Sequence, residues 1–295
     1  MKSRCLNATR ATTPAVAREQ GNHSCPARRI ETGIVGRPDR AIADRRGGIG
    51  NPFSYVGESG ESEAELRRGL SHQTDMLDEH PLITRLGDPQ EIIVQTACEL
   101  KAEIIVLCKN SNSHPQPNLG RTATAVLRES PCPLILVPPE RGLTSWYLHH
   151  ILVPHDGTPT TSASLKPAVD LADRAGAELL VAHITDSISA SKEPGTLTSP
   201  RYVDQPQYEW AAWGSEFANR LACICPLGHV HLRVFLGHGD PAAEILRLSE
   251  RHSSDMIVLA WRGEWEVPRA AILKEVLRRA HCPVFVLRTG ETGGE

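Results

Sequence analysis

A carboxylate and an imidazole stand side by side at the end of a short apolar run in the second half of the chain. Ile151 to Pro154 are apolar, and His155, Asp156 and Gly157 follow before a stretch rich in Ser and Thr that can begin a helix. This order is typical of a buried parallel strand that ends in a turn. Open α/β sheets bind ligands beyond the carboxyl ends of their strands.

We therefore expect Asp156 to contact a ligand, with Pro154 and the titratable His155 beside it. His155 could face the same crevice. An Asp-Gly-Thr sequence is also ordinary turn chemistry, and the sequence alone leaves that alternative open.

The elements that must position these residues alternate regularly from His150 to Arg288. Asp240 can cap a helix and Pro241 can occupy its first turn, while Gly176 can end an earlier helix. Five strands alternating with four helices predict a parallel sheet covered on both faces, with right-handed crossovers. The predicted strands lie near residues 151–154, 179–184, 231–236, 256–259 and 284–287, and the helices near 165–176, 207–224, 241–248 and 270–280.

Three blocks of this segment resemble the universal stress protein family. They are Ile151–Gly157, Gly239–Ala242 and Val276–Val284, in the same order along the chain as in the family. Three blocks in order are a far more specific signal than any one of them. The resemblance implies an adenine nucleotide alpha hydrolase-like α/β fold, in which a five-stranded parallel sheet has the order 3-2-1-4-5.

The resemblance also implies where a nucleotide would lie. After the fourth strand, ATP-binding members carry G-x-x-G, nine residues, and then G-S or G-T, because glycines let backbone N–H groups approach phosphates. The corresponding positions here are Ala260, Gly263, Ala270 and Ala271, with six residues between Gly263 and Ala270. One glycine remains, the hydroxyl is missing and the loop is short. We therefore expect no bound cofactor. The alternative is that ATP binds at these four positions together with Pro154, His155 and Asp156.

Composition narrows the classes of partner. Lys and Arg total 32 against 35 Asp and Glu, a net charge of −3, so no overall field favours nucleic acid. No apolar run approaches the ~20 residues of a membrane span, and the first residues lack the apolar core of a secretory signal. The eight cysteines have neither disulfide nor zinc spacing. We expect a cytoplasmic protein with no membrane, nucleic-acid or metal partner.

Part of the second half is repeated earlier in the chain. Gly87-Asp88-Pro89 repeats Gly239-Asp240-Pro241, and Ile104–Leu107 matches Met256–Leu259 at the same offset of 152. The chain therefore holds two copies of one unit.

The first copy is expected to be incomplete, because nothing before residue 61 resembles Ile151–Ile184. We predict a disordered segment at 1–60, a partial unit at 61–139 that starts with a helix over Glu63–Leu77, a linker at 140–149, and a complete domain at 150–290.

The fifth strands of the two units, Leu134–Val137 and Val284–Leu287, are predicted to pair. Such pairing would cover two sheet edges at once. It would make a pseudo-dimer within one chain, and a homodimer through the same edges is the alternative.

Three functional hypotheses follow. The favoured one is a non-catalytic regulatory or interaction module in the stress response, with a degenerate ATP-binding loop and no catalytic residues. The second is an adenine-nucleotide-binding stress protein with weak or no hydrolysis, and the third is a small-molecule enzyme on the same fold. Trp261 and Trp265, in the degenerate loop, would fill the nucleotide space, pack in the core or form a patch that faces a partner. Fold alone does not decide among the three functional hypotheses.

Overall fold

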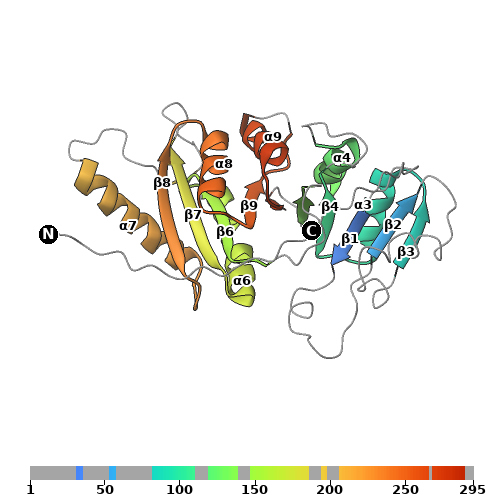
Figure 1. Cartoon of the computed structure of the whole chain (residues 1–295), viewed down its shortest axis with the longest axis horizontal. Coiled ribbons are helices and arrows are strands. Elements are labelled where there is room, and N and C mark those ends of the chain that lie inside the picture. Colours follow the sequence, from blue (N-terminus) through green and yellow to red (C-terminus); the bar gives the residue numbers. More distant parts are fainter. Residues whose placement is uncertain are drawn as a thin grey trace, which may run out of the picture.

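The computed structural model describes residues 31–35, 53–57, 82–109, 119–138, 147–185, 194–197, 206–265 and 268–289. Figure 1 shows the first unit, in blue to green, beside the second unit, in yellow-green to red. Their strands form one sheet with the order β3-β2-β1-β4-β5-β10-β9-β6-β7-β8. None of the described helices is both long and apolar enough to cross a membrane.

The second unit has the predicted fold. Its strands are all parallel to their neighbours within the unit and run β8-β7-β6-β9-β10, which is the order 3-2-1-4-5. Its elements are β6 (His150–His155), α5 (Pro159–Ser162), α6 (Leu165–Ala175), β7 (Glu178–Thr185), α7 (Pro206–Ile224), β8 (Leu232–His238), α8 (Pro241–Arg251), β9 (Met256–Trp261), α9 (Pro268–Arg279) and β10 (Val284–Arg288).

Local signals place the helix ends in both units. The Asp240 side chain accepts a hydrogen bond of 2.8 Å from the backbone N–H of Ala243 at the start of α8. In the repeated turn, Asp88 accepts one of 3.0 Å from Gln90 at the start of α3 (Pro89–Glu99). A side-chain oxygen at this position satisfies an N–H group that the helix leaves free.

Alternate residues of the central strand β6 serve two cores. Leu152 belongs to a cluster with buried residues of α8 and α9, which extends without interruption into the first unit. Ile151 and Val153 face the opposite side, where α6 and α7 pack. Because successive side chains of a strand point to opposite faces, His155 is expected on the α6/α7 side with Ile151 and Val153.

The described residues of the first unit form five strands, and two of these strands lie within the segment 1–60 that the sequence predicts to be disordered. Two strands that the sequence did not predict lie between β3 and β4, in the positions of strands one and two. The bounds in this unit are β1 (Glu31–Val35), β2 (Phe53–Gly57), β3 (Leu82–Leu86), β4 (Ile104–Cys108), α4 (Arg121–Glu129) and β5 (Leu134–Val137).

Strand β1 differs from its counterpart β6 because it runs antiparallel to both of its neighbours. It nevertheless supplies hydrogen-bonding partners for the edge of β4, which would otherwise be unpaired. The helix predicted over Glu63–Leu77 lies outside the described residues.

The two units meet through their fifth strands, as predicted. β5 and β10 pair antiparallel, with Phe285 opposite Ile135. The predicted pairing of the two fifth strands is therefore present within the chain. Each fifth strand has a neighbour on both sides.

Two side chains cross this junction in opposite directions. Lys109, only 4% exposed, donates from Nζ to the carbonyl oxygen of Ala280, just after α9, over 2.6 Å. Arg288 donates from Nη1 to the carbonyl oxygen of Arg128 in the last turn of α4, over 3.1 Å. A cation at the carboxyl end of a helix is favoured by the helix dipole. Each unit thus stabilises the end of a helix in the other.

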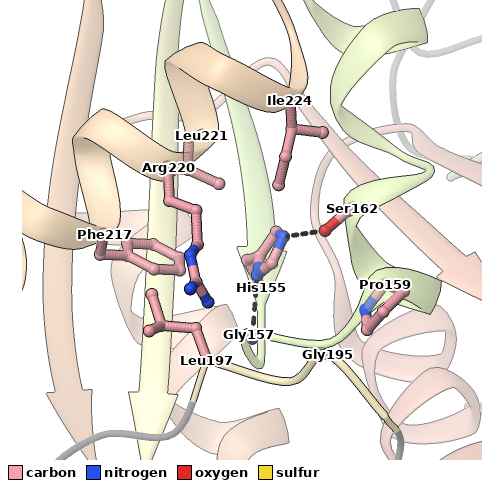
Figure 2. Close-up of a pocket in the computed structure, with 10 residues that line it drawn as sticks. All are labelled: His155, Gly157, Pro159, Ser162, Gly195, Leu197, Phe217, Arg220, Leu221 and Ile224. Atoms are coloured by element: carbon pink, nitrogen blue, oxygen red, sulfur yellow. Dashed lines mark hydrogen bonds between the residues drawn. The ribbon is translucent and has the colours of Figure 1, made fainter.

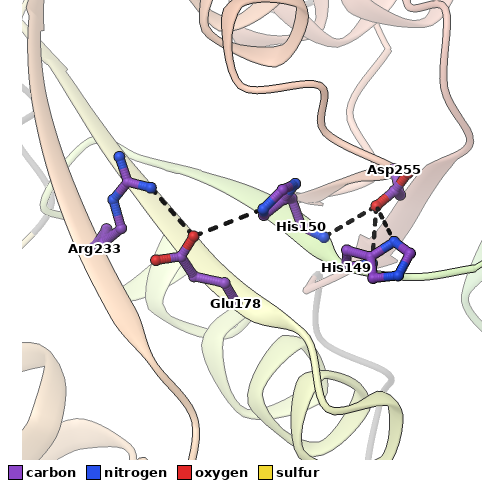
Figure 3. A network of polar contacts seen from close by, with 5 residues as sticks. All are labelled: His149, His150, Glu178, Arg233 and Asp255. Carbon is purple, nitrogen blue, oxygen red and sulfur yellow. Dashed lines mark hydrogen bonds and ion pairs between the residues drawn. The ribbon is translucent and has the colours of Figure 1, made fainter. Parts of the chain in front are cut away.

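A polar network joins strands at the amino end of the second unit's sheet (Figure 3). Asp255 Oδ2 accepts hydrogen bonds from the backbone N–H groups of His149 and His150, at 2.8 and 3.0 Å. Glu178 Oε2 lies 3.2 Å from Arg233 Nη1 and 3.8 Å from His150 Nε2. This network fixes the start of β6 and lies at the opposite end of the strands from the predicted site.

Candidate functional site

The two central strands of the second unit separate toward their carboxyl ends. β6 and β9 pair only at Ile151 with Met256 and Leu152 with Ile257. β6 and β7, in contrast, remain paired as far as His155. β6 and β9 also flank the point where the strand order reverses, which is where open α/β sheets place their ligand crevice.

The structure brings most of the predicted site residues to this end of the sheet. Pro154 lies near the end of β6, and Asp156 directly follows that strand. Ala260 lies in β9, and Gly263 follows that strand. Ala270 is buried in the first turn of α9, and Ala271 beside it is exposed.

The Asp156 carboxylate organises its own turn. Its Oδ1 accepts three hydrogen bonds: 3.0 Å from the Thr158 backbone N–H, 2.6 Å from the Thr158 hydroxyl and 2.8 Å from the Thr161 hydroxyl. Thr158 in turn caps α5 by accepting from the backbone N–H of Thr161. These contacts match the turn chemistry that the Asp-Gly-Thr sequence allowed.

The loop after β9 reaches across the opening. Arg262 Nε donates a hydrogen bond of 2.9 Å to Thr160 Oγ1 in α5. This contact links the two sides of the crevice at its mouth.

The two tryptophans of this loop pack on the protein itself. Trp261 is 7% exposed and belongs to the core cluster on the α8/α9 side. Its ring meets the edge of Trp265 at a centroid distance of 5.7 Å, and Lys274 Nζ lies 4.5 Å from the centre of the Trp265 ring. Of the three roles left open by the sequence, these contacts correspond to core packing.

Gly263 is the only glycine kept from the family's phosphate-binding pattern. Its φ of +87° suits glycine, and a Cβ at this position would lie 2.5 Å from Arg288 Nε. The open side of this glycine is therefore covered by the same guanidinium that crosses to the first unit.

The His155 side chain lies on the α6/α7 side of β6 with Ile151 and Val153, because side chains alternate along a strand. Its ring contacts Phe217 of α7 at a centroid distance of 5.3 Å. The side chain is 3% exposed, and burial lowers its pKa from 6.5 to about 4.

The imidazole of His183 is also buried and lies next to His155. His183 Nδ1 lies 2.9 Å from the backbone oxygen of His155 and donates to it, because a carbonyl can only accept. Burial again lowers the pKa to about 4. Trp213 and Phe217 stack on each other and both contact this ring.

His155 also lines a cavity of about 290 Å³ between α5, α7 and the segment 194–197 (Figure 2). Sequence reasoning missed this cavity and the α7 residues that form its wall: Phe217, Arg220, Leu221 and Ile224. Their spacing of three and four residues puts them on one helix face, which was the available signal. Their approach to His155 depends on tertiary packing.

A family model now decides the relationship that the three blocks suggested. The model of the Universal stress protein family matches residues 48–138 and 148–288. The chain belongs to this family. The first match begins before residue 61, in agreement with the position of β2.

Individual relatives extend the comparison. A universal stress protein of Methanocaldococcus jannaschii is 23% identical over 141 residues, which are 47% of this chain and 81% of that protein. The crystal structure of a universal stress protein from Archaeoglobus fulgidus aligns with a TM-score of 0.53 and 16% identity over 83% of this chain and 88% of that one. A universal stress protein solved in complex with cAMP aligns with 50% of this chain and 100% of its own, at 18% identity and a TM-score of 0.36.

Proposed function

We propose that this universal stress protein is a non-catalytic regulatory or interaction module whose nucleotide loop has degenerated. The observation that carries the proposal is the hydrogen bond from Arg262 to Thr160 across the mouth of the crevice. A triphosphate that entered between β6 and β9 would have to break this contact.

The remaining polar groups of the crevice support the same proposal. Asp156 Oδ1 already accepts three hydrogen bonds from Thr158 and Thr161. Phosphate binding by a loop requires several backbone N–H groups that a ligand can approach closely. Here Gly263 is covered by Arg288, and alanines stand where the pattern has glycine or a hydroxyl.

The alternative is an adenine-nucleotide-binding stress protein, and one observation favours it. Two guanidinium groups, those of Arg262 and Arg288, lie at the loop that carries Gly263. Arginine binds phosphate oxygens directly. Both side chains would have to leave their present partners, Thr160 and the Arg128 carbonyl, to do so.

Calorimetric titration of the full chain with Mg-ATP, AMP and cAMP tests the proposal. We expect no saturable binding with a Kd below about 100 µM. A universal stress protein that crystallises with cAMP serves as the positive control. Saturable binding by the wild-type chain would overturn the proposal and establish the nucleotide-binding alternative.

Two variants locate the cause of either result. Arg262→Ala removes the bridge to Thr160, so binding that appears only in this variant would identify the bridge as the barrier. Asp156→Asn keeps the Oδ1 acceptor, so a loss of wild-type binding in this variant would report ligand contact rather than a collapsed turn. Phosphate release from ATP, measured in parallel, would reveal turnover if the chain were an enzyme.

We also propose that a linker at residues 140–149 divides the two units, with the complete domain at 150–290. The first unit extends upstream of residue 61 to include β1 and β2, so that its sheet has the same number of strands as that of its partner.

A further inference from the structure

The cavity between α5 and α7 is separate from the crevice described above. His155 lines it from the α6/α7 side of the sheet, whereas Asp156, the next residue, belongs to the crevice. Its volume of about 290 Å³ is near the lower end of the range for small-molecule sites. A ligand here would not compete with one bound between β6 and β9.

The inner end of the cavity carries neutral hydrogen-bonding groups. His155 Nδ1 accepts from the backbone N–H of Gly157 over 2.9 Å, so the ring proton is on Nε2. Nε2 then donates to Ser162 Oγ over 3.1 Å, and the Ser162 hydroxyl donates to the Thr158 carbonyl over 2.9 Å. The inner end therefore has no net charge.

The walls of the cavity are apolar. Phe217 and Leu221 from α7 face Leu197 from the segment that follows β7 (Figure 2). Leu197 is held in place because its backbone N–H donates to the Gly157 oxygen over 2.8 Å. Ile224, one turn after Leu221, lines the cavity and is 50% exposed, which is unusual for a large apolar side chain in this protein.

Arg220 gives the cavity a positive charge. It is the only charged side chain among the described residues that line the cavity. Figure 2 shows its side chain reaching from α7 past Phe217 toward Leu197. Arg220 forms no hydrogen bond or ion pair with any other described residue, including Glu216 one helical turn earlier. An unpaired guanidinium beside an apolar cavity is complementary to an anion that carries an apolar body.

We propose that this cavity binds a small amphipathic monocarboxylic acid. The carboxylate pairs with Arg220, and the apolar body lies against Phe217, Leu221 and Ile224. Through this site a small molecule would bind to the protein and regulate it without any nucleotide. Each methylene that leaves water on binding strengthens affinity by about fourfold.

Octanoate and octan-1-ol are the probes, because they share one apolar chain and differ in charge. Titrated into the full chain, octanoate is expected to bind at least about tenfold more tightly than octan-1-ol, as one charge-assisted hydrogen bond provides. A large excess of Mg-ATP should leave the affinity for octanoate unchanged. No saturable binding of octanoate, or equal affinity for the two probes, would overturn the proposal.

Three variants test the residues. Arg220→Gln should abolish the preference for octanoate, whereas Arg251→Gln, which removes an arginine from α8 on the other face of the sheet, should keep it. Ile224→Trp should block the entrance and weaken both probes. Arg220 and Ile224 are exposed enough for these variants to fold, and a thermal melt verifies this. A preference that persists in Arg220→Gln, or binding unaffected in Ile224→Trp, would refute the site.

Discussion

Replacement of Asp156 separates a structural role from a ligand-binding role. Three hydrogen bonds end on its Oδ1, and Thr158, which donates two of them, is fully buried. Asp156→Ala leaves these donors without their acceptor. A hydrogen bond to a charged group contributes about 1.5–3 kcal/mol, but the Thr158 and Thr161 hydroxyls, 3.2 Å apart, can partly pair with each other. We therefore expect a loss of about 3 kcal/mol.

Asp156→Asn is the matched control because it keeps an oxygen where all three donors point. Only the charge is lost, and the expected cost is about 1 kcal/mol. For a domain of this size the melting temperature should fall by about 6–12 °C in the alanine variant and about 2–4 °C in the asparagine variant. Differential scanning calorimetry without ligand measures both. An alanine variant that melts within about 2 °C of the wild type, or two variants that are equally destabilised, would refute this reasoning.

Two further predictions concern the buried histidines and the remaining loop glycine. Because burial lowers the pKa values of His155 and His183 to about 4, the unfolded chain binds more protons than the folded chain between pH 6.5 and 4. The free energy of unfolding should then fall as the pH drops through this window, by roughly 3 kcal/mol for each histidine. The variant His183→Phe should show half of this fall. Urea midpoints that do not change with pH would contradict the prediction. Gly263→Ala should lower the free energy of unfolding by about 2 kcal/mol, because of the positive φ at this position and the contact of the new Cβ with Arg288. Adding Arg288→Ala to this variant should restore the part of the loss that is due to the contact. Urea denaturation of the four combinations measures this coupling, and strictly additive costs would show that Arg288 does not restrict Gly263.

The second unit could be predicted from sequence because buried parallel strands have nearly continuous apolar runs. The predicted strand at 231–236 is observed at Leu232–His238, and Asp240 caps the following helix as expected. β1 and β2 could not be predicted in this way. Each has five residues without a helical or strand-like period long enough to recognise, and each is defined by the backbone pairing of its neighbours.

In the candidate site, too, the local features could be predicted from the sequence and the long-range contacts could not. The position of Asp156 at a strand end follows from local sequence, and so do its partners Thr158 and Thr161, two and five residues later. The bridge from Arg262 to Thr160 joins residues 102 positions apart. The side of the sheet that His155 faces depends on the register of β6, and a shift of one residue in that register reverses it.

The antiparallel join between β5 and β10 has a consequence for how the protein behaves at low abundance. Two separate subunits held by such an edge would come apart on dilution, whereas units on one polypeptide meet at an effective concentration in the millimolar range. Their ratio is fixed at one to one during synthesis. Each unit therefore keeps the other beside it, and the buried hydrogen bond from Lys109 to the Ala280 carbonyl is not lost on dilution.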